Sequence, residues 1–265
     1  MSFYLTEYFS LLEELQKNSY RLRNISSFFN AASHKHSKCA SGDSPQQSSC
    51  ILRHDVDRRP DAALAMARAE QKRSIQSTYY FRCDRYGNFQ KDYIAAIADM
   101  GHEIGYHYED LSRAGGKNSL AINRFTQNLA RLRVHANCQT VAMHGAPLSK
   151  HHNEDLLRHH RLAEFGLSSD ASLSFEEITC LYVTDTGGKW MSDSNLRDFA
   201  GVPYNIMFSS VFSSDFFNDL KNFKPLIYLS THPERWANNR LQYAVIKSVD
   251  TGTNMVKSLI RAVGI

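Results

Sequence analysis

Features typical of secreted, membrane-spanning and nucleic-acid-binding proteins are missing from this sequence. No run of apolar residues approaches the ~18 that a membrane-spanning helix needs, so no transmembrane segment is expected. The first residues lack a basic stretch followed by a continuous apolar stretch, so we predict no signal peptide. Lysine and arginine form no stripe with interleaved aromatic residues, which argues against nucleic acid as a partner.

Cysteine is scarce and scattered. The five cysteines are odd in number and show no Cys-x-x-Cys spacing: Cys39, Cys50, Cys83, Cys138 and Cys180. This pattern suits reduced thiols better than a disulfide framework. Together with the missing signal peptide, it predicts a cytoplasmic protein.

The composition that remains is that of an ordinary globular protein, with 42% hydrophobic and 22% charged residues. A chain of 265 residues can form one large domain, and α/β barrels commonly have this size. Apolar residues at helical spacing predict a helical segment over 5–30, and the polar stretch 31–49 predicts a loop. We therefore divide the chain into an N-terminal helical extension with a polar loop (1–50) and a barrel domain (51–265).

Strand and helix signals alternate through the barrel domain. Strands are expected over 50–53, 77–82, 103–107, 140–144, 181–185, 205–208 and 225–230. Helices are expected over 60–73, 91–100, 120–133, 153–161, 214–221 and 241–263. Repeated βα units predict an α/β fold with one parallel sheet, closed or nearly closed into a single-domain barrel.

Two carboxylates stand at the end of the first strand of this barrel, in the stretch Arg53-His54-Asp55-Val56-Asp57. Residues i and i+2 of a strand point to the same face, so Asp55 and Asp57 are expected to converge on one site. Two carboxylates this close resist being ionised together unless a cation lies between them. The stretch therefore indicates a metal site.

Other polar residues follow the ends of the remaining strands. They are Arg82, His107, His144, Asp185 and His232. In β/α barrels the carboxyl ends of the strands carry the active site, so these residues are expected to share one rim with Asp55 and Asp57. His102, at the start of its strand, is expected to be structural.

The order of three motifs resembles the NodB-homology polysaccharide deacetylases, carbohydrate esterase family 4. The motifs are the aspartate-rich stretch above, Gly101-His102-Glu103-Ile104-Gly105-Tyr106-His107, and Ser230-Thr231-His232-Pro233. The resemblance runs from about Ile51 to Trp236 and marks a divergent member of the family. It implies a deformed (β/α) barrel, one divalent metal ion (zinc before cobalt or manganese) and hydrolysis of an N-acetyl group on an amino sugar.

The resemblance also assigns roles to residues. It makes Asp55 the general base, Asp57 and His107 metal ligands, and His232 the general acid. The second family motif places another histidine four residues after the first, where this chain has Leu111. A third ligand would then come from His144, Glu109 or Asp110, or the site has lost that ligand and binds metal weakly or not at all.

The later motifs are looser. His144 stands where the family has an arginine that orients the base, so His144 either orients Asp55 or binds the metal. Arg53 and Arg82 are the candidates for the missing cation. Asp185 and Trp190 match parts of the fourth motif, which implies that Asp185 steadies a basic partner and that Trp190 stacks on a sugar or walls the acyl pocket.

The sequence thus predicts a metal-dependent hydrolase of non-peptide C–N bonds that acts in surface-polysaccharide (O-antigen-like) biosynthesis. Its expected partner is an N-acylated sugar, a nucleotide sugar or a lipid-linked glycan. Two alternatives stay open at this point. One is a catalytically degenerate barrel that binds carbohydrate, and the other is a hydrolase of a different C–N bond, such as a formyl amide.

Overall fold

The computed structural model describes residues 3–36, 48–147, 149–190, 195, 197, 199–203, 212–222 and 225–263. The strand expected over 205–208 lies outside these residues. Within them, no helix is both long enough and apolar enough to cross a bilayer.

The centre of the structure is a parallel sheet in which eight strands are described. In chain order the strands are β1 (Arg21–Arg23), β2 (Ser49–Val56), β3 (Thr78–Phe81), β4 (Glu103–Tyr108), β5 (Thr140–Met143), β6 (Ser169–Asp170), β7 (Leu181–Thr184) and β8 (Ile227–Thr231). Their spatial order is β6-β5-β4-β3-β2-β8-β7, and β1 pairs with the beginning of β2. The sheet curves into a half-barrel, which confirms the predicted deformed (β/α) barrel. Among the described residues no ladder joins its edge strands β6 and β7.

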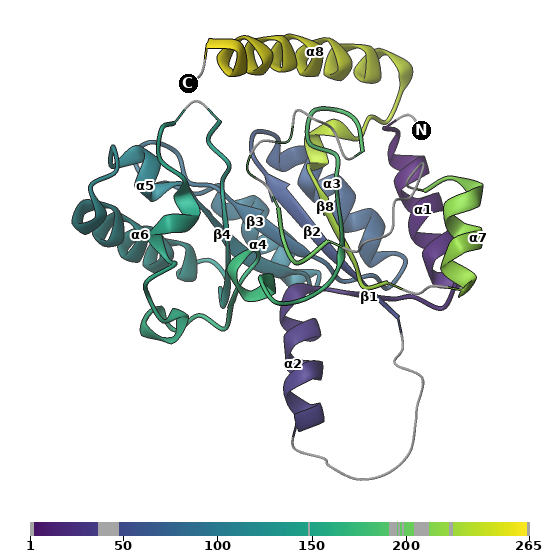
Figure 1. The fold of residues 1–265 in the computed structure, drawn as a ribbon, viewed down its shortest axis with the longest axis horizontal. Helices are drawn as coiled ribbons and strands as arrows, with labels where there is room; N and C mark the ends of the chain where they lie inside the picture. The colour runs from purple at the N-terminus through teal and green to yellow at the C-terminus, as the bar shows by residue number, and fades with distance from the viewer. Residues whose placement is uncertain are drawn as a thin grey trace.

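Helices surround this sheet. They are α1 (Leu5–Lys17), α2 (Ile25–His36), α3 (Pro60–Gln71), α4 (Lys91–Asp99), α5 (Asp110–Arg113), α6 (Asn118–Arg133), α7 (Ser214–Asn222) and α8 (Arg240–Val263). Short 3₁₀ helices follow β5, β6 and β8: η1 (Asn153–Leu156) and η2 (Leu162–Phe165) after β5, η3 (Leu173–Phe175) after β6, and η4 (Pro233–Arg235) after β8. In Figure 1, α8 lies along one side of the molecule and α2 projects from the opposite side.

Strand β2 carries Asp55 and leads into Asp57, and it lies between neighbouring strands of the sheet. Every residue of β2 after Ser49 is buried, as expected for a parallel strand covered on both faces. Strand β8 pairs along one edge of β2, whereas β1 and then β3 pair along the other. The polar residues at the end of β2 are therefore held from both sides.

The N-terminal segment is part of this packing. Its predicted single helical stretch is wrong, because β1 separates α1 from α2. Tyr8, Leu12 and Leu15 of α1 are buried in one apolar cluster with Leu52 of β2 and Leu229 of β8. The division of the chain at residue 50 stays a prediction, although residues before it supply a strand and a buried helix to the barrel.

Most other expected elements are confirmed within a few residues. The expected loop over 31–49 is corrected at its beginning, because α2 continues to His36. The helix expected over 153–161 is only the 3₁₀ turn η1. Leu156 and Leu157 are consecutive and are followed by exposed residues, so no apolar stripe at helical spacing continues the turn. Strand β6 was not expected, because two residues are too few to produce a hydrophobic pattern.

Candidate active site

The residues expected at one rim meet there, except that Asp185 is fully buried beside His232 and does not line the cavity. Asp55, Asp57, His107, His144 and His232 line a cavity of about 320 Å³ at the carboxyl ends of β2, β4, β5 and β8. The other lining residues are Arg58, Arg82, Met143, Gly145, Ala146, Pro147, Thr186, Asn195, Arg197, Arg235 and Thr253. Thr253 belongs to α8, so this helix borders the mouth of the cavity.

Asp55 is bound by an arginine from its own strand. The Arg53 guanidinium donates two hydrogen bonds to the carboxylate, Nε to Oδ1 at 2.8 Å and Nη2 to Oδ2 at 2.7 Å. Both side chains are buried. Burial alone would raise the pKa of Asp55, but Arg53 and two nearby histidines lower it below its ordinary value. Of the two arginines predicted as the missing cation, Arg53 is the one that holds Asp55.

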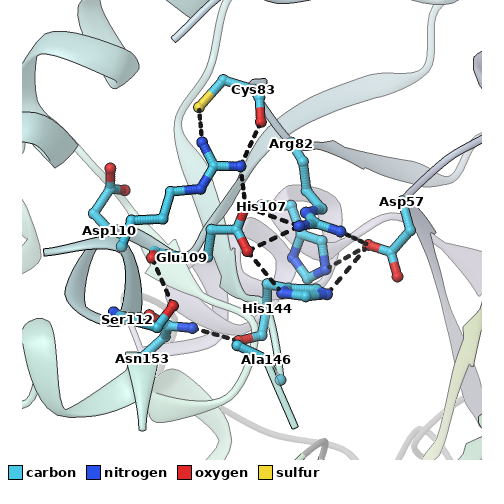
Figure 2. A network of polar contacts seen from close by, with 12 residues as sticks. Asp57, Arg82, Cys83, His107, Glu109, Asp110, Ser112, His144, Ala146 and Asn153 are labelled. Atoms are coloured by element: carbon cyan, nitrogen blue, oxygen red, sulfur yellow. Dashed lines mark hydrogen bonds and ion pairs between the residues drawn. The ribbon is translucent and has the colours of Figure 1, made fainter. Parts of the chain in front are cut away.

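Asp57 faces two imidazoles, as Figure 2 shows. Its Oδ1 atom lies 3.5 Å from Nε2 of His107 and 3.8 Å from Nε2 of His144. This oxygen is buried and has no hydrogen-bond partner among the described residues. Nδ1 of His107 lies 3.0 Å from the carbonyl oxygen of Ala142, which can only accept, so Nδ1 carries the proton.

This arrangement leaves a lone pair of His107 facing carboxylate oxygens. Burial lowers the pKa of His107 to about 4, so the ring is neutral near pH 7 and its Nε2 has no hydrogen. That nitrogen is 3.6 Å from Oδ2 of Asp55 as well as 3.5 Å from Asp57. Arg82 lies 3.6 Å from the same oxygen of Asp57 and Arg53 is paired with Asp55, so the protein itself balances part of this negative charge. A metal ion among these acceptor atoms would balance it further.

A divalent ion fits this donor set. Asp57, His107 and His144 supply one carboxylate and two imidazoles, a set that zinc and other first-row metals accept while keeping open positions for water and substrate. The described residues contain no group of three or more His, Cys, Asp or Glu side chains already at coordination spacing.

Contacts of Glu109 distinguish it from His144 as third ligand. The Arg82 guanidinium donates to both oxygens of Glu109 at 2.8 Å, and Arg113 forms a second ion pair with it. Nδ1 of His144 lies 3.1 Å from the same carboxylate, which orients the opposite nitrogen toward Asp57. Glu109 thus contacts the side of the His144 ring that faces away from Asp57 (Figure 2).

Asp110, the other candidate for the third ligand, forms hydrogen bonds away from Asp57. Its buried carboxylate accepts hydrogen bonds from the Tyr106 hydroxyl at 2.7 Å and from Asn128 at 2.8 Å. Leu111, in the position of the missing histidine, is buried in the apolar core. His144 is therefore the candidate that reaches Asp57.

His232 forms an ion pair with Asp185. Nδ1 of His232 donates to Oδ1 of Asp185 at 2.6 Å, and its backbone N–H donates to Oδ2 at 3.0 Å. Burial lowers the pKa of His232, but the Asp185 carboxylate outweighs it and raises the value to about 9. His232 is therefore protonated near pH 7, with Nδ1 occupied by Asp185.

Some residues near the site were not expected from the sequence. The indole N–H of Trp236 donates to Asp185 at 3.0 Å and fixes this carboxylate from a second side. Glu234 is buried, and burial together with the nearby Asp57 charge raises its pKa to about 7. Both lie within four residues of His232, in the stretch His-Pro-Glu-Arg-Trp. This closeness in the sequence is the feature that could have predicted their place near the site.

Trp190 lies apart from this cavity. It packs against Phe3 and Trp236, with ring centroids 5.2 and 5.7 Å away, and it lines a second cavity instead. His102 is structural as expected. Its ring is buried and contacts the carbonyl of Ala67 at 3.0 Å and the backbone N–H of Ser77 at 3.3 Å.

Comparison with known proteins gives likenesses of structure only. No protein-family model matches the chain, and no curated protein matches it. Among solved structures, the chain is similar to BA3943, a CE4 family pseudoenzyme from Bacillus anthracis, with 10% identity and a TM-score of 0.44. The match covers 79% of this chain and 63% of that protein, so the chain spans less than two thirds of its length.

Two further solved structures carry the same family name. A family 4 carbohydrate esterase from Bacillus anthracis matches with 14% identity and a TM-score of 0.37, covering 91% of this chain and 83% of that one. A Streptococcus mutans CE4 esterase matches with 12% identity and a TM-score of 0.41, covering 83% and 84%. Likenesses at this level do not establish an activity.

Proposed function

We propose that this chain is a metal-dependent hydrolase that removes an N-acetyl or similar N-acyl group from an amino sugar. One observation carries the proposal. An ionised Asp55, an Asp57 carboxylate that faces the imidazoles of His107 and His144, and a protonated His232 surround a single cavity. Hydrolysis of an amide needs a base, an electrophile and an acid, and these side chains have the corresponding protonation states.

The side chains divide the reaction between them. A bound divalent ion would polarise the acyl oxygen and make water a better nucleophile. Asp55, kept ionised by Arg53, accepts a proton from the attacking water. His232 donates its Nε2 proton to the amide nitrogen as the C–N bond breaks, so a free amine and a carboxylate leave.

We also propose a substrate class and a cellular location. We infer an N-acylated sugar, nucleotide sugar or lipid-linked glycan of surface-polysaccharide (O-antigen-like) biosynthesis, handled in the cytoplasm. The sequence motifs and the scattered cysteines support this choice. Zinc is the expected ion because the donor set mixes imidazole with carboxylate, and cobalt or manganese should substitute.

Acetate release from N-acetylated sugars tests the activity. Asp55→Asn and His232→Ala should each lower turnover about 10²- to 10⁴-fold at unchanged metal content, since each removes one proton-transfer group. Asp61→Asn and His159→Ala, on the exposed surface, are matched controls that should retain full activity.

Three results would contradict the proposal in whole or in part. A wild-type protein that binds amino sugars but releases neither acetate nor formate with zinc, cobalt or manganese is a carbohydrate-binding barrel instead. Release of formate but not acetate would identify a formyl-amide hydrolase. An Asp55→Asn variant as fast as wild type would remove Asp55 from the role of base.

A further inference from the structure

A second cavity of about 320 Å³ lies between α8 and the turn after β7. Its lining residues are Phe3, Gly187, Gly188, Lys189, Trp190, Arg235, Tyr243, Ile246, Lys247, Asp250, Thr251 and Asn254. Asn254 closes one side, because its side-chain N–H donates to the carbonyl of Gly187 at 2.8 Å. The turn and the helix thus form one wall together.

This cavity adjoins the candidate active site. Arg235 lines both cavities. Thr186 of the first cavity precedes Gly187 of the second in the chain, and Thr253 of α8 likewise precedes Asn254. The two cavities are therefore neighbours, with Arg235 in the wall of each.

Aromatic rings form much of the wall, and two buried polar atoms lie at it. Trp190 and Phe3 have ring centroids 5.2 Å apart, and Tyr243 is stacked on Tyr4 at 5.0 Å. The indole N–H of Trp190 and Oδ1 of Asn254 are buried and have no hydrogen-bond partner among the described residues. A free donor and a free acceptor beside aromatic rings suit a ring that carries hydroxyl groups.

The charge of the lining is positive. Lys189, Lys247 and Arg235 are basic, and Asp250 is the acidic residue among the lining residues. The Asp250 carboxylate forms an ion pair with Arg235, so it does not neutralise the lysines. An anionic group is the natural complement of two exposed ammonium groups beside the cavity.

We propose that the second cavity binds the phosphate-bearing part of the substrate, next to the amino sugar whose acyl group is removed. This inference rests on the proposed function and narrows it to sugars linked to phosphate, such as a sugar phosphate or a nucleotide sugar. The lysines bind the phosphate oxygens. Where the phosphate carries a second hydroxyl-bearing ring, as in a nucleotide sugar, Trp190 and Asn254 bind that ring.

Three probes of increasing size test the substrate class: N-acetylglucosamine, its 1-phosphate and its uridine diphosphate ester. We expect kcat/KM for deacetylation to rise at least ~10-fold from the neutral sugar to the 1-phosphate, the size expected for a hydrogen bond to a charged group. The double variant Lys189→Gln/Lys247→Gln should lose this gain and keep the rate on the neutral sugar. Lys72→Gln/Lys91→Gln, at exposed positions on other elements, is the matched control.

A gain from the diphosphate ester but not from the 1-phosphate would place the nucleotide, rather than the first phosphate, in the cavity. Equal kcat/KM for all three probes would overturn the inference while leaving the proposed activity intact. So would a gain that survives in the double lysine variant.

Binding can be followed without catalysis. The chain has two tryptophans, so uridine diphosphate should change the intrinsic fluorescence through Trp190, and Trp190→Phe should remove most of that change. The lysine variant should weaken this binding at least ~10-fold. Binding of uridine diphosphate without any deacetylation would keep the phosphate site and refute the hydrolase. If the protein fails to bind uridine diphosphate but still deacetylates neutral sugars, the phosphate site is refuted and the hydrolase is kept.

Discussion

The Asp185 carboxylate raises the pKa of His232. The substitution Asp185→Asn removes this negative charge and keeps a side chain of nearly the same shape. In the wild type the carboxylate accepts from Nδ1 of His232 at 2.6 Å and holds its pKa at about 9, although burial acts in the opposite direction. Asparagine can still accept the indole N–H of Trp236 but carries no charge. We therefore expect the pKa of His232 to fall to its ordinary value or below.

The size of the effect depends on pH. At pH 8 a histidine with a pKa of about 9 is about nine-tenths protonated, whereas one at the ordinary value of ~6.5 is only about 3% protonated. If His232 is the general acid, kcat/KM of Asp185→Asn should be about 30-fold below wild type at pH 8. Near pH 6, where both forms are mostly protonated, the ratio should be close to one.

The assay is the pH profile of kcat/KM for acetate release between pH 5.5 and 10. The wild-type rate should fall as pH rises through about 9, and the alkaline limb of Asp185→Asn should move to lower pH by about two units or more. Asp61→Asn serves as the control. A variant with an unshifted limb, or with the same loss at every pH, would refute this coupling of Asp185 to His232.

The same ion pair should affect stability with a definite sign. Because the folded pKa of His232 is raised, its contribution is fully present below pH ~6.5 and is lost as pH rises through about 9. The shift corresponds to about 3 kcal/mol in the free energy of unfolding. Denaturant unfolding of the wild type at pH 6 and pH 9.5 should show part of this difference, and Asp185→Asn should lack it.

Other predictions concern the metal and the fold. His144→Ala should lower zinc content measured by elemental analysis, whereas Asp110→Asn should retain it, because Asp110 is held by Tyr106 and Asn128. Gly105→Ala should destabilise the fold by several kcal/mol in denaturant unfolding, since its Cβ would overlap the buried Tyr80 ring. Leu12→Ala should cost about 2–5 kcal/mol in the same experiment, because Leu12 is fully buried in the core.

The sequence predicted the rim because strand periodicity alone carries that information. Asp55 and Asp57 had to share a face, and residues after parallel strands had to meet at one edge. The bidentate pair of Arg53 with Asp55 follows from the same i, i+2 rule, although the sequence left Arg53 and Arg82 as equal candidates. Only side-chain geometry separates them, because Arg82 points to Glu109 and Asp57.

Other features had no local signal. Strand β1 is three residues long and depends on pairing with β2, which lies more than twenty residues later in the chain. The cavity beside α8 needs Phe3 and Asn254 from opposite ends of the chain. Contacts of this kind arise from tertiary packing, and no window of residues encodes them by periodicity.

The proposed position of the third ligand, after β5 rather than at Leu111, has a structural reason. Strands β4 and β5 are parallel neighbours, and the backbone N–H of His144 donates to the carbonyl of Tyr108 at 2.8 Å, which aligns the two strand ends. A side chain just after β5 therefore reaches the space beside His107, and the ring centroids of His144 and His107 are 5.3 Å apart. With His144 in that space and steadied by Glu109, residue 111 is free to join the apolar core. On the proposed assignment, the third ligand comes from the strand next to β4, and Asp57, His107 and His144 form the three-residue donor set.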